Sequence, residues 1–184
     1  ITFQFDMEKV INLGIPHVGE LIFENIDTPG LFKCLEVSET WRELAENVLV
    51  KRKKGVMFEA CNNGETKVVQ LLLERCNSEE SGLNTKDEYG FTPFMWACRN
   101  GHKDVVQLLL EHNSDPKIDL NAKDDLGWTA FMYACRNRQK DVVNLLLNHL
   151  DANTCINWNA ANAFGLTALL YAFIYRHNPI VFGL

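Results

Sequence analysis

The chain has 184 residues, with 24 acidic against 18 basic side chains and a formal net charge of −6 at pH 7. This negative balance disfavours binding to nucleic acid, and no apolar run approaches the length of a membrane span, so we expect protein partners. Apolar residues make up 47% and charged residues 23% of the sequence, which is typical of a folded protein and argues against disorder. The length allows one extended domain or two small ones.

Apolar side chains recur with helical spacing before residue 45. Val18, Leu21, Ile22 and Ile26 follow one another at i, i+3, i+4 and i+8, which places them on one stripe of a helix. The turn Asp-Thr-Pro-Gly at 27–30 contains a second helix start, and further apolar residues with helical spacing are Leu31, Leu35, Trp41 and Leu44. Three short helices bury too little surface to be stable alone, so we expect this segment to dock on the rest of the chain, on a partner, or on both.

The same segment resembles an F-box, a family motif that begins with Leu-Pro and closes with Val-Cys-x-x-Trp-Arg. The corresponding residues here are Ile15-Pro16, the isoleucines at 22 and 26, Leu31, and the phrase Val-Ser-Glu-Thr-Trp-Arg at 37–42. The resemblance implies an F-box-like helical domain over residues 10–52 that binds a Skp-family adaptor. The residues expected to bind the adaptor are Pro16, Leu21, Ile22, Ile26, Leu31, Leu35, Val37 and Trp41.

Four basic residues, Lys51 to Lys54, follow this segment. A run of this kind serves as a nuclear import patch, as a contact for an acidic partner, or as a solvated hinge face. The hinge face is the commonest of the three, and the sequence leaves the other two open.

A five-residue motif occurs three times, at residues 90–94, 127–131 and 165–169. In each copy a glycine is followed by a large apolar residue and then by a threonine at which a helix can start. Its copies lie 37 and then 38 residues apart, and leucine triplets that start at Leu71, Leu108 and Leu145 keep the 37-residue spacing. A fixed period of this length indicates stacked copies of one small unit. Because one helix pair cannot bury its own apolar face, neighbouring copies have to cover it.

Each copy predicts a turn followed by two helices. The Thr92 hydroxyl can cap the first helix, and Pro93 then occupies the first helical position, where its missing N–H breaks no bond. This helix spans 94–99 and ends at Gly101, since glycine adopts the left-handed conformation without strain. The second helix spans 103–112 and carries apolar residues on more than one face, so we expect it to be buried on several sides.

These copies resemble ankyrin repeats, whose phrase Thr-Pro-Leu-His-x-Ala is followed by Gly-His and a valine-leucine helix. Here the phrase reads Thr-Pro-Phe-Met-Trp-Ala at 92–97, with Gly-His at 101–102 and a valine-leucine run at 105–110. The family's histidine is replaced by Met95, Met132 and Leu170, which removes a polar anchor from the turn. The loops are about four residues longer than usual.

The ankyrin resemblance implies an all-α solenoid of about 3.5 repeats with long loops, which follows the F-box-like segment. Its expected repeats are residues 55–86, 87–123, 124–161 and a truncated copy at 162–184. Because the last copy stops within its second helix, we expect the natural protein to continue beyond Leu184.

No motif in the sequence carries catalytic or metal chemistry. The six cysteines include no C-x-x-C pair, and the five histidines have no ligand spacing. Cys61, Cys98 and Cys135 follow the alanine of successive repeats, which favours small buried thiols in a reducing compartment. We therefore expect no catalytic residue, no cofactor and no metal ion, and a cytoplasmic or nuclear location.

Trp96, Tyr133 and Tyr171 hold equivalent positions in successive copies, which predicts aromatic packing between repeats. An exposed Trp128 would form an apolar binding patch, and alternatively the extra loop residues fold over it. The ankyrin resemblance implies that the target protein contacts the turns and the ends of the first helices, where residue types that dominate interface energies are frequent. These positions are Glu88, Tyr89, Phe91, Arg99, Asn100, Asp125, Leu126, Trp128, Arg136, Asn137, Phe164 and Leu166.

Two hypotheses for function follow. In the first, the chain is the substrate receptor of an SCF-type cullin-RING ubiquitin ligase, in which the F-box-like helices bind the Skp-family adaptor and the ankyrin face binds an unknown target protein. Catalysis then belongs to other subunits, and this chain acts by proximity. In the second, the chain is an ankyrin scaffold whose first helices cap the repeats, with Val18, Ile22 and Ile26 packed against Val56, Phe58 and Val69.

Overall fold

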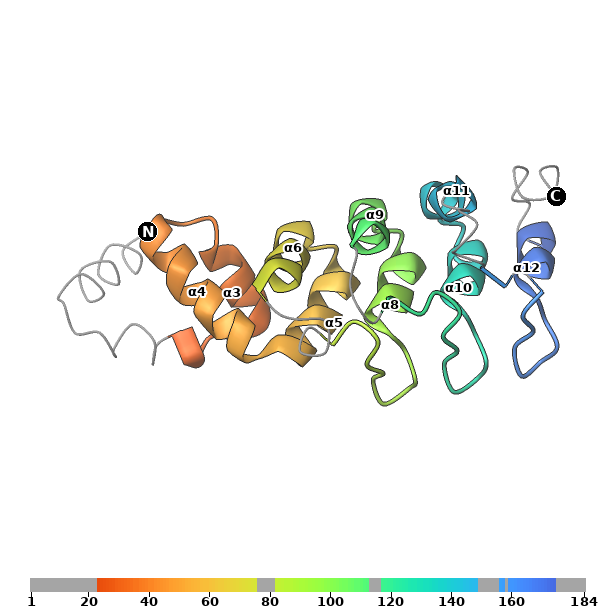
Figure 1. Ribbon diagram of the computed structural model, residues 1–184, viewed down its shortest axis with the longest axis horizontal. Coiled ribbons are helices and arrows are strands. Elements are labelled where there is room, and N and C mark those ends of the chain that lie inside the picture. Colours follow the sequence, from red (N-terminus) through yellow and green to blue (C-terminus); the bar gives the residue numbers. More distant parts are fainter. Residues whose placement is uncertain (1–22, 76–81, 113–116, 149–155, 158, 175–184) are drawn as a thin grey trace. The chain divides into compact units, whose positions relative to one another are not determined.

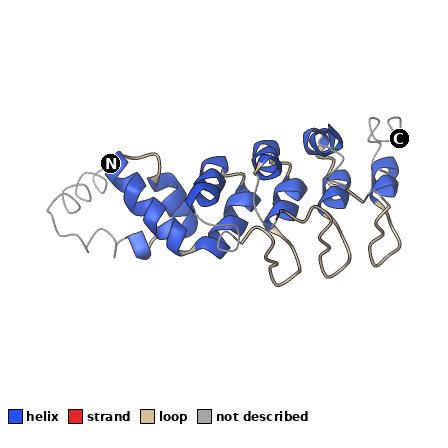
Figure 2. Ribbon diagram, viewed as in Figure 1, coloured by secondary structure: helices blue, strands red, loops and turns tan. Residues whose placement is uncertain are grey.

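The computed structural model describes residues 23–75, 82–112, 117–148, 156–157 and 159–174. Their regular structure is helical (Figure 2), and an isolated bridge between Ala161 and Thr167 is the one β-type pairing among them. The helices are α3 (Thr28–Cys34), α4 (Glu39–Lys51), α5 (Lys53–Asn63), α6 (Thr66–Arg75), α8 (Pro93–Asn100), α9 (Lys103–Glu111), α10 (Ala130–Arg136), α11 (Lys140–Asn148) and α12 (Ala168–Ile174). The prediction of an all-α protein built from helix pairs is thereby confirmed.

The chain divides into two compact units, residues 1–56 and 57–184. In the first unit α3 and α4 pack as a hairpin. The Asp27 carboxylate caps α3 by accepting the Gly30 N–H at 3.0 Å, and the Ser38 hydroxyl caps α4 by accepting the Trp41 N–H at 3.4 Å. The turn at 27–30 therefore starts a helix, as the sequence predicts.

Two members of the basic run contact the segment that precedes α3. The Arg52 guanidinium donates to the carbonyl oxygens of Ile26 at 2.8 Å and Glu24 at 2.5 Å, and Lys51 forms an exposed ion pair with the Glu24 carboxylate at 3.3 Å. An exposed pair of this kind contributes little stability. The Arg52 bonds to backbone satisfy two carbonyl groups, which gives this residue a structural role.

The second unit consists of stacked helix pairs. Helix α8 packs on α9 and α10, α10 packs on α11 and α12, and α9 packs on α6 and α11. In Figure 1 the helices α6, α9 and α11 form one row, and the loops that lead into α8, α10 and α12 project to the same side of the helices. The repeated turns thus share one direction, as stacked copies of one unit require.

The local signals of each repeat act as the sequence predicts. The hydroxyls of Thr92, Thr129 and Thr167 each accept the N–H three residues later, at 3.3, 3.3 and 3.4 Å. Pro93 begins α8, and Gly101 ends it in the left-handed region at φ 80°. Met95 replaces the family's histidine, and the Thr92 N–H still has an acceptor, because it donates to the Met95 sulfur at 3.4 Å.

The repeats are tied together by side-chain bonds to backbone and by close packing at two glycines. His102 Nε2 lies 2.8 Å from the Asn62 carbonyl, and in the next repeat the Gln139 amide donates to the Arg99 carbonyl at 3.1 Å. Gly64 and Gly101 both have positive φ, and a Cβ there would collide with His102 and Gln139 respectively. Glycine is therefore favoured at both positions by conformation, and a larger residue would also displace the neighbouring side chain.

The core thiols are inert. Cys61, Cys98 and Cys135 are fully buried thiols, as the sequence indicates. Burial raises the pKa of the Cys135 thiol to about 12 and that of Cys61 further still. At neutral pH these side chains are uncharged apolar packing groups, since the thiolate is the reactive form.

Arg138 occupies the position of the helix-ending glycine in its repeat, with φ 58°. We expect Arg138→Gly to raise the free energy of unfolding by up to about 1 kcal/mol, because the left-handed conformation costs a residue with a side chain about that much. The matched change Gly101→Ala should lower it by more than about 1 kcal/mol, since the added Cβ meets Gln139. Urea denaturation measures both, and a less stable Arg138→Gly variant would contradict the assignment of strain.

Candidate functional site

A continuous row of aromatic rings runs through three repeats of the second unit. The ring centroids of Phe91 lie 4.7 Å from Trp96 and 4.9 Å from Tyr133. Those of Trp128 lie 5.0 Å from Tyr133 and 4.7 Å from Tyr171. The rings of one repeat therefore contact those of the next, which confirms the prediction of aromatic packing between repeats.

In each of these three repeats, the ring of Trp96, Tyr133 or Tyr171 is hydrogen-bonded to a polar side chain nine residues earlier in the sequence. Trp96 Nε1 donates to the Asp87 carboxylate at 3.0 Å, and the Tyr133 hydroxyl donates to the Asp124 carboxylate at 2.5 Å. In the third copy Asn162 takes this place, with its amide nitrogen 3.3 Å from the Tyr171 hydroxyl oxygen. Burial and the hydrogen bond to Asp124 raise the pKa of Tyr133 above its ordinary value, so its phenol stays protonated.

The same polar side chains shape the hairpin that precedes each first helix. The other oxygen of Asp124 accepts the N–H groups of Leu126 at 3.0 Å and Trp128 at 2.7 Å. Asp87 and Asn162 accept the two equivalent N–H groups of their own hairpins. One side chain in each repeat thus orients both the hairpin and the aromatic ring.

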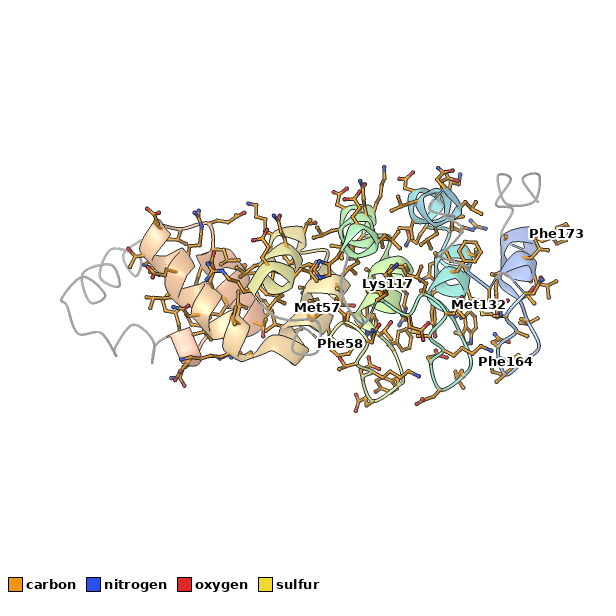
Figure 3. All side chains as sticks on the ribbon, viewed as in Figure 1. Met57, Phe58, Lys117, Met132, Phe164 and Phe173 are labelled. Carbon is orange, nitrogen blue, oxygen red and sulfur yellow. The ribbon has the colours of Figure 1, made fainter. Side chains whose placement is uncertain are left out.

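The end of each hairpin exposes a large apolar side chain. Tyr89, Leu126 and Phe164 hold equivalent positions and are 62%, 52% and 65% exposed; we call these three the tip row. Figure 3 shows Phe164 on the loop that leads into α12. Successive tips are joined by backbone bonds, from Asp125 N–H to the Tyr89 carbonyl at 3.3 Å and from Ala163 N–H to the Leu126 carbonyl at 2.8 Å. The tip row is therefore a connected surface within the second unit.

Two arginines lie over the aromatic row. The Arg99 guanidinium is 4.9 Å from the Trp96 ring centroid and 5.5 Å from that of Phe91, and the Arg136 guanidinium is 5.0 Å from that of Trp128. Neither arginine forms an ion pair with a carboxylate of the described residues. The second unit thus presents two positive groups, one repeat apart, beside the tip row.

The structure divides the predicted target-binding residues by exposure. Trp128 and Phe91 are buried, at 5% and 7% exposure, so the prediction of an exposed Trp128 patch is wrong. Neighbouring aromatic rings cover both side chains. Arg99 and Leu166 are half-buried, and the remaining residues are exposed: Glu88, Tyr89, Asn100, Asp125, Leu126, Arg136, Asn137 and Phe164.

Two of the exposed residues have a structural role. The Asn100 amide donates to the Asn62 carbonyl at 2.9 Å, and the Asn137 amide donates to the Arg99 carbonyl at 2.8 Å. Both bonds cross from one repeat to the one before. These asparagines stabilise the stack whether or not a partner binds them.

The predicted adaptor-binding residues do not form one exposed surface in the described part of the first unit. Leu31, Leu35 and Trp41 are buried, and the Trp41 ring meets Phe23 edge-on at 5.5 Å. Ile26 and Val37 are half-buried. The other three, Pro16, Leu21 and Ile22, lie outside the described residues.

Sequence reasoning missed Asp87, Asp124 and Asn162 as the residues that organise this surface. The available signal was their spacing, since they recur 37 and 38 residues apart and each precedes an aromatic residue of the row by nine positions. An acidic residue in a turn is ordinarily solvated, which hides such a role until the repeats are aligned on one another. Asp124 is in fact buried.

Stacked helix pairs with hairpins on one side define a helical-repeat binding protein. The family model described as ankyrin repeats (three copies) matches residues 31–119 and 116–184, so the chain belongs to the ankyrin-repeat family. No curated protein matches the chain. The first match begins inside the segment that resembles an F-box, and the comparisons give that resemblance no support.

The described residues hold no cluster of three or more His, Cys, Asp or Glu side chains suited to a metal ion. Within the same ranges, no helix combines the length and apolar character that a membrane crossing requires. The tip row and the two arginines are therefore the features from which a function is best argued.

The third repeat provides a natural control for the role of Asp124. We expect Asp124→Asn to change the free energy of unfolding by less than about 1 kcal/mol, because Asn162 makes the equivalent contacts. Asp124→Ala removes the acceptor of three hydrogen bonds and should cost about 2–4 kcal/mol. Chemical denaturation measures both variants, and equal losses would show that the carboxylate charge matters more than the bonding pattern.

Proposed function

We propose that this chain is a non-catalytic protein-binding module, an ankyrin-repeat scaffold that holds its partner on the tip row and on the adjacent ends of the first helices. The observation that carries the proposal is the repeated exposure of Tyr89, Leu126 and Phe164. A large apolar side chain exposed at the same place in three consecutive repeats makes one apolar surface, which is typical of an interaction site.

The geometry of the tips supports tight binding. Covering a side chain of this size contributes about 1.5–3 kcal/mol. The backbone bonds between tips hold the three hairpins in position relative to one another before any partner arrives. A surface ordered in advance loses little conformational entropy on binding, so more of the gain appears as affinity.

The first unit fits a helical cap better than a free adaptor-binding domain. Residues 31–52 lie within the ankyrin match, and the burial of Leu31, Leu35 and Trp41 keeps those side chains from a partner as long as the α3–α4 hairpin stays closed. These two observations support the scaffold with an N-terminal cap over the ubiquitin-ligase hypothesis.

The substrate-receptor role is the second candidate, and one structural feature favours it beyond the sequence resemblance. The Trp41 indole N–H is buried and has no hydrogen-bond acceptor among the residues that the structure describes, whereas buried donors are almost always paired. A partner that reorganised the α3–α4 hairpin would supply an acceptor. This is the chemistry that an adaptor complex would have to provide.

Photo-crosslinking tests the tip row. Benzoylphenylalanine placed at Leu126 or Phe164 should form crosslinks to partner protein in cells, because both positions are exposed on the tips. The same group at Gln107, which is exposed on the second helix α9, serves as the matched control and should give at least tenfold less product. Equal yields at the three positions would remove the tip row as the binding surface.

Titration with a purified Skp-family adaptor tests the second candidate. If the adaptor binds, Ile26→Asp should abolish binding and leave the helical circular dichroism unchanged, because Ile26 is only half-buried. Trp41→Ala should instead lower the free energy of unfolding by about 3–5 kcal/mol, since it removes a buried ring. The absence of measurable binding by the unmodified chain would exclude the substrate-receptor role.

A further inference from the structure

The two arginines over the aromatic row carry charges that the described part of the chain leaves without an ion-pair partner. Burial and the bond to Asp124 raise the pKa of Tyr133, and the positive charges of Arg99 and Arg136 oppose that shift, which places both guanidiniums near the same phenol. The carboxylates of Asp87 and Asp124 are each occupied by three hydrogen bonds from their own repeats. Both guanidiniums are therefore open to a carboxylate of another molecule.

The aromatic backing prepares these guanidiniums for a carboxylate. A guanidinium that lies over a ring keeps its N–H edges free, and those edges match the two oxygens of a carboxylate. Arg99 is near three rings, those of Phe91, Trp96 and Tyr133, so its side chain has lost much of its freedom before binding. Less entropy is then lost when an acid binds.

The spacing of the pair suggests the form of the acidic segment. Arg99 and Arg136 hold equivalent positions on α8 and α10, which pack directly, so their axes lie about 8–10 Å apart. A polyproline II segment rises about 3.1 Å per residue with three residues per turn, and its residues i and i+3 face the same side about 9 Å apart. Two acids spaced in this way would each meet one arginine.

We propose that the partner presents an acidic segment to this face, with carboxylates at i and i+3 that pair with Arg99 and Arg136 while its apolar side chains cover the tip row. This inference rests on the proposed function and names the chemistry of its partner. A single-stranded nucleic acid also carries spaced negative charge, but the rings of Phe91, Trp128 and Tyr133 are buried and offer no face for base stacking.

The charges around the pair refine the fit. Glu88 and Asp125 are exposed at the tips, and Lys86 and Lys123 donate to carbonyl oxygens of the following repeats at 2.7 and 3.1 Å. The exposed charges at the tips are thus mixed and balance one another, two acids against two lysines. The paired arginines are therefore the groups to which the acidic residues of the partner are assigned.

Fluorescence anisotropy with a labelled peptide of sequence (Glu-Pro-Pro)3-Glu tests the proposal on the full chain in 50 mM NaCl. We expect saturable binding that weakens strongly at 500 mM NaCl, since exposed charges are screened. Arg99→Gln/Arg136→Gln should weaken binding at least tenfold. The control Lys103→Gln/Lys140→Gln makes the same change in charge in the same repeats, at exposed sites on α9 and α11, and should change it less than twofold.

The conservative double variant Arg99→Lys/Arg136→Lys keeps the positive charges, so it tests the pairing geometry even if the glutamine variant misfolds. It should bind more weakly than the unmodified chain, because lysine cannot pair with both carboxylate oxygens. Three results would each overturn the proposal. The first is failure of the glutamate peptide to bind at 1 mM, and the second is an equal loss of affinity in Arg99→Gln/Arg136→Gln and in Lys103→Gln/Lys140→Gln. The third is tighter binding of a ten-residue thymidine oligonucleotide than of the peptide. Crosslinking at Leu126 and Phe164 without peptide binding would overturn the acidic partner and leave the tip row standing.

Discussion

Asp87, Asp124 and Asn162 each hold a hairpin and an aromatic ring at once, and the packing of the second unit depends on that double contact. Two backbone N–H groups and one ring substituent lose their bonding partner if the side chain is removed, and each unpaired buried group costs about 1–3 kcal/mol. The rings fixed in this way stack from repeat to repeat. One side chain in each of these three repeats therefore orients both the hairpin and the ring that contacts the neighbouring repeat.

The surface available for binding follows from this arrangement. Because the rings pack inward, the residue on the other side of the hairpin is directed outward, which produces the tip row of Tyr89, Leu126 and Phe164. The same rings support Arg99 and Arg136 on their outer side. The aromatic row packs into the interior and also supports the candidate binding surface. Substitutions in the aromatic row are therefore expected to affect both stability and binding.

The two units differ in how strongly function can be argued from them. In the second unit a recurring set of contacts supports the proposed surface at three equivalent places. In the first unit the α3–α4 hairpin buries Leu31, Leu35 and Trp41, three of the eight residues that the F-box resemblance assigns to an adaptor, and the ankyrin match extends over α4. Within the described residues the resemblance rests on positions 26, 31, 37, 41 and 42, where apolar helical spacing and a Trp-Arg pair also suit a small helical hairpin.

Local and periodic features were readable from the chain alone. The threonine caps, the glycine helix ends and the 37-residue period depend on neighbouring residues or on simple repetition, and they gave the helix pairs and their stacking. The chain alone did not reveal that Trp128 is buried while Leu126 is exposed, because both are apolar residues beside one glycine. That choice is made by the rings of Tyr133 and Tyr171, which lie about 5 Å from Trp128 only after the repeats have stacked.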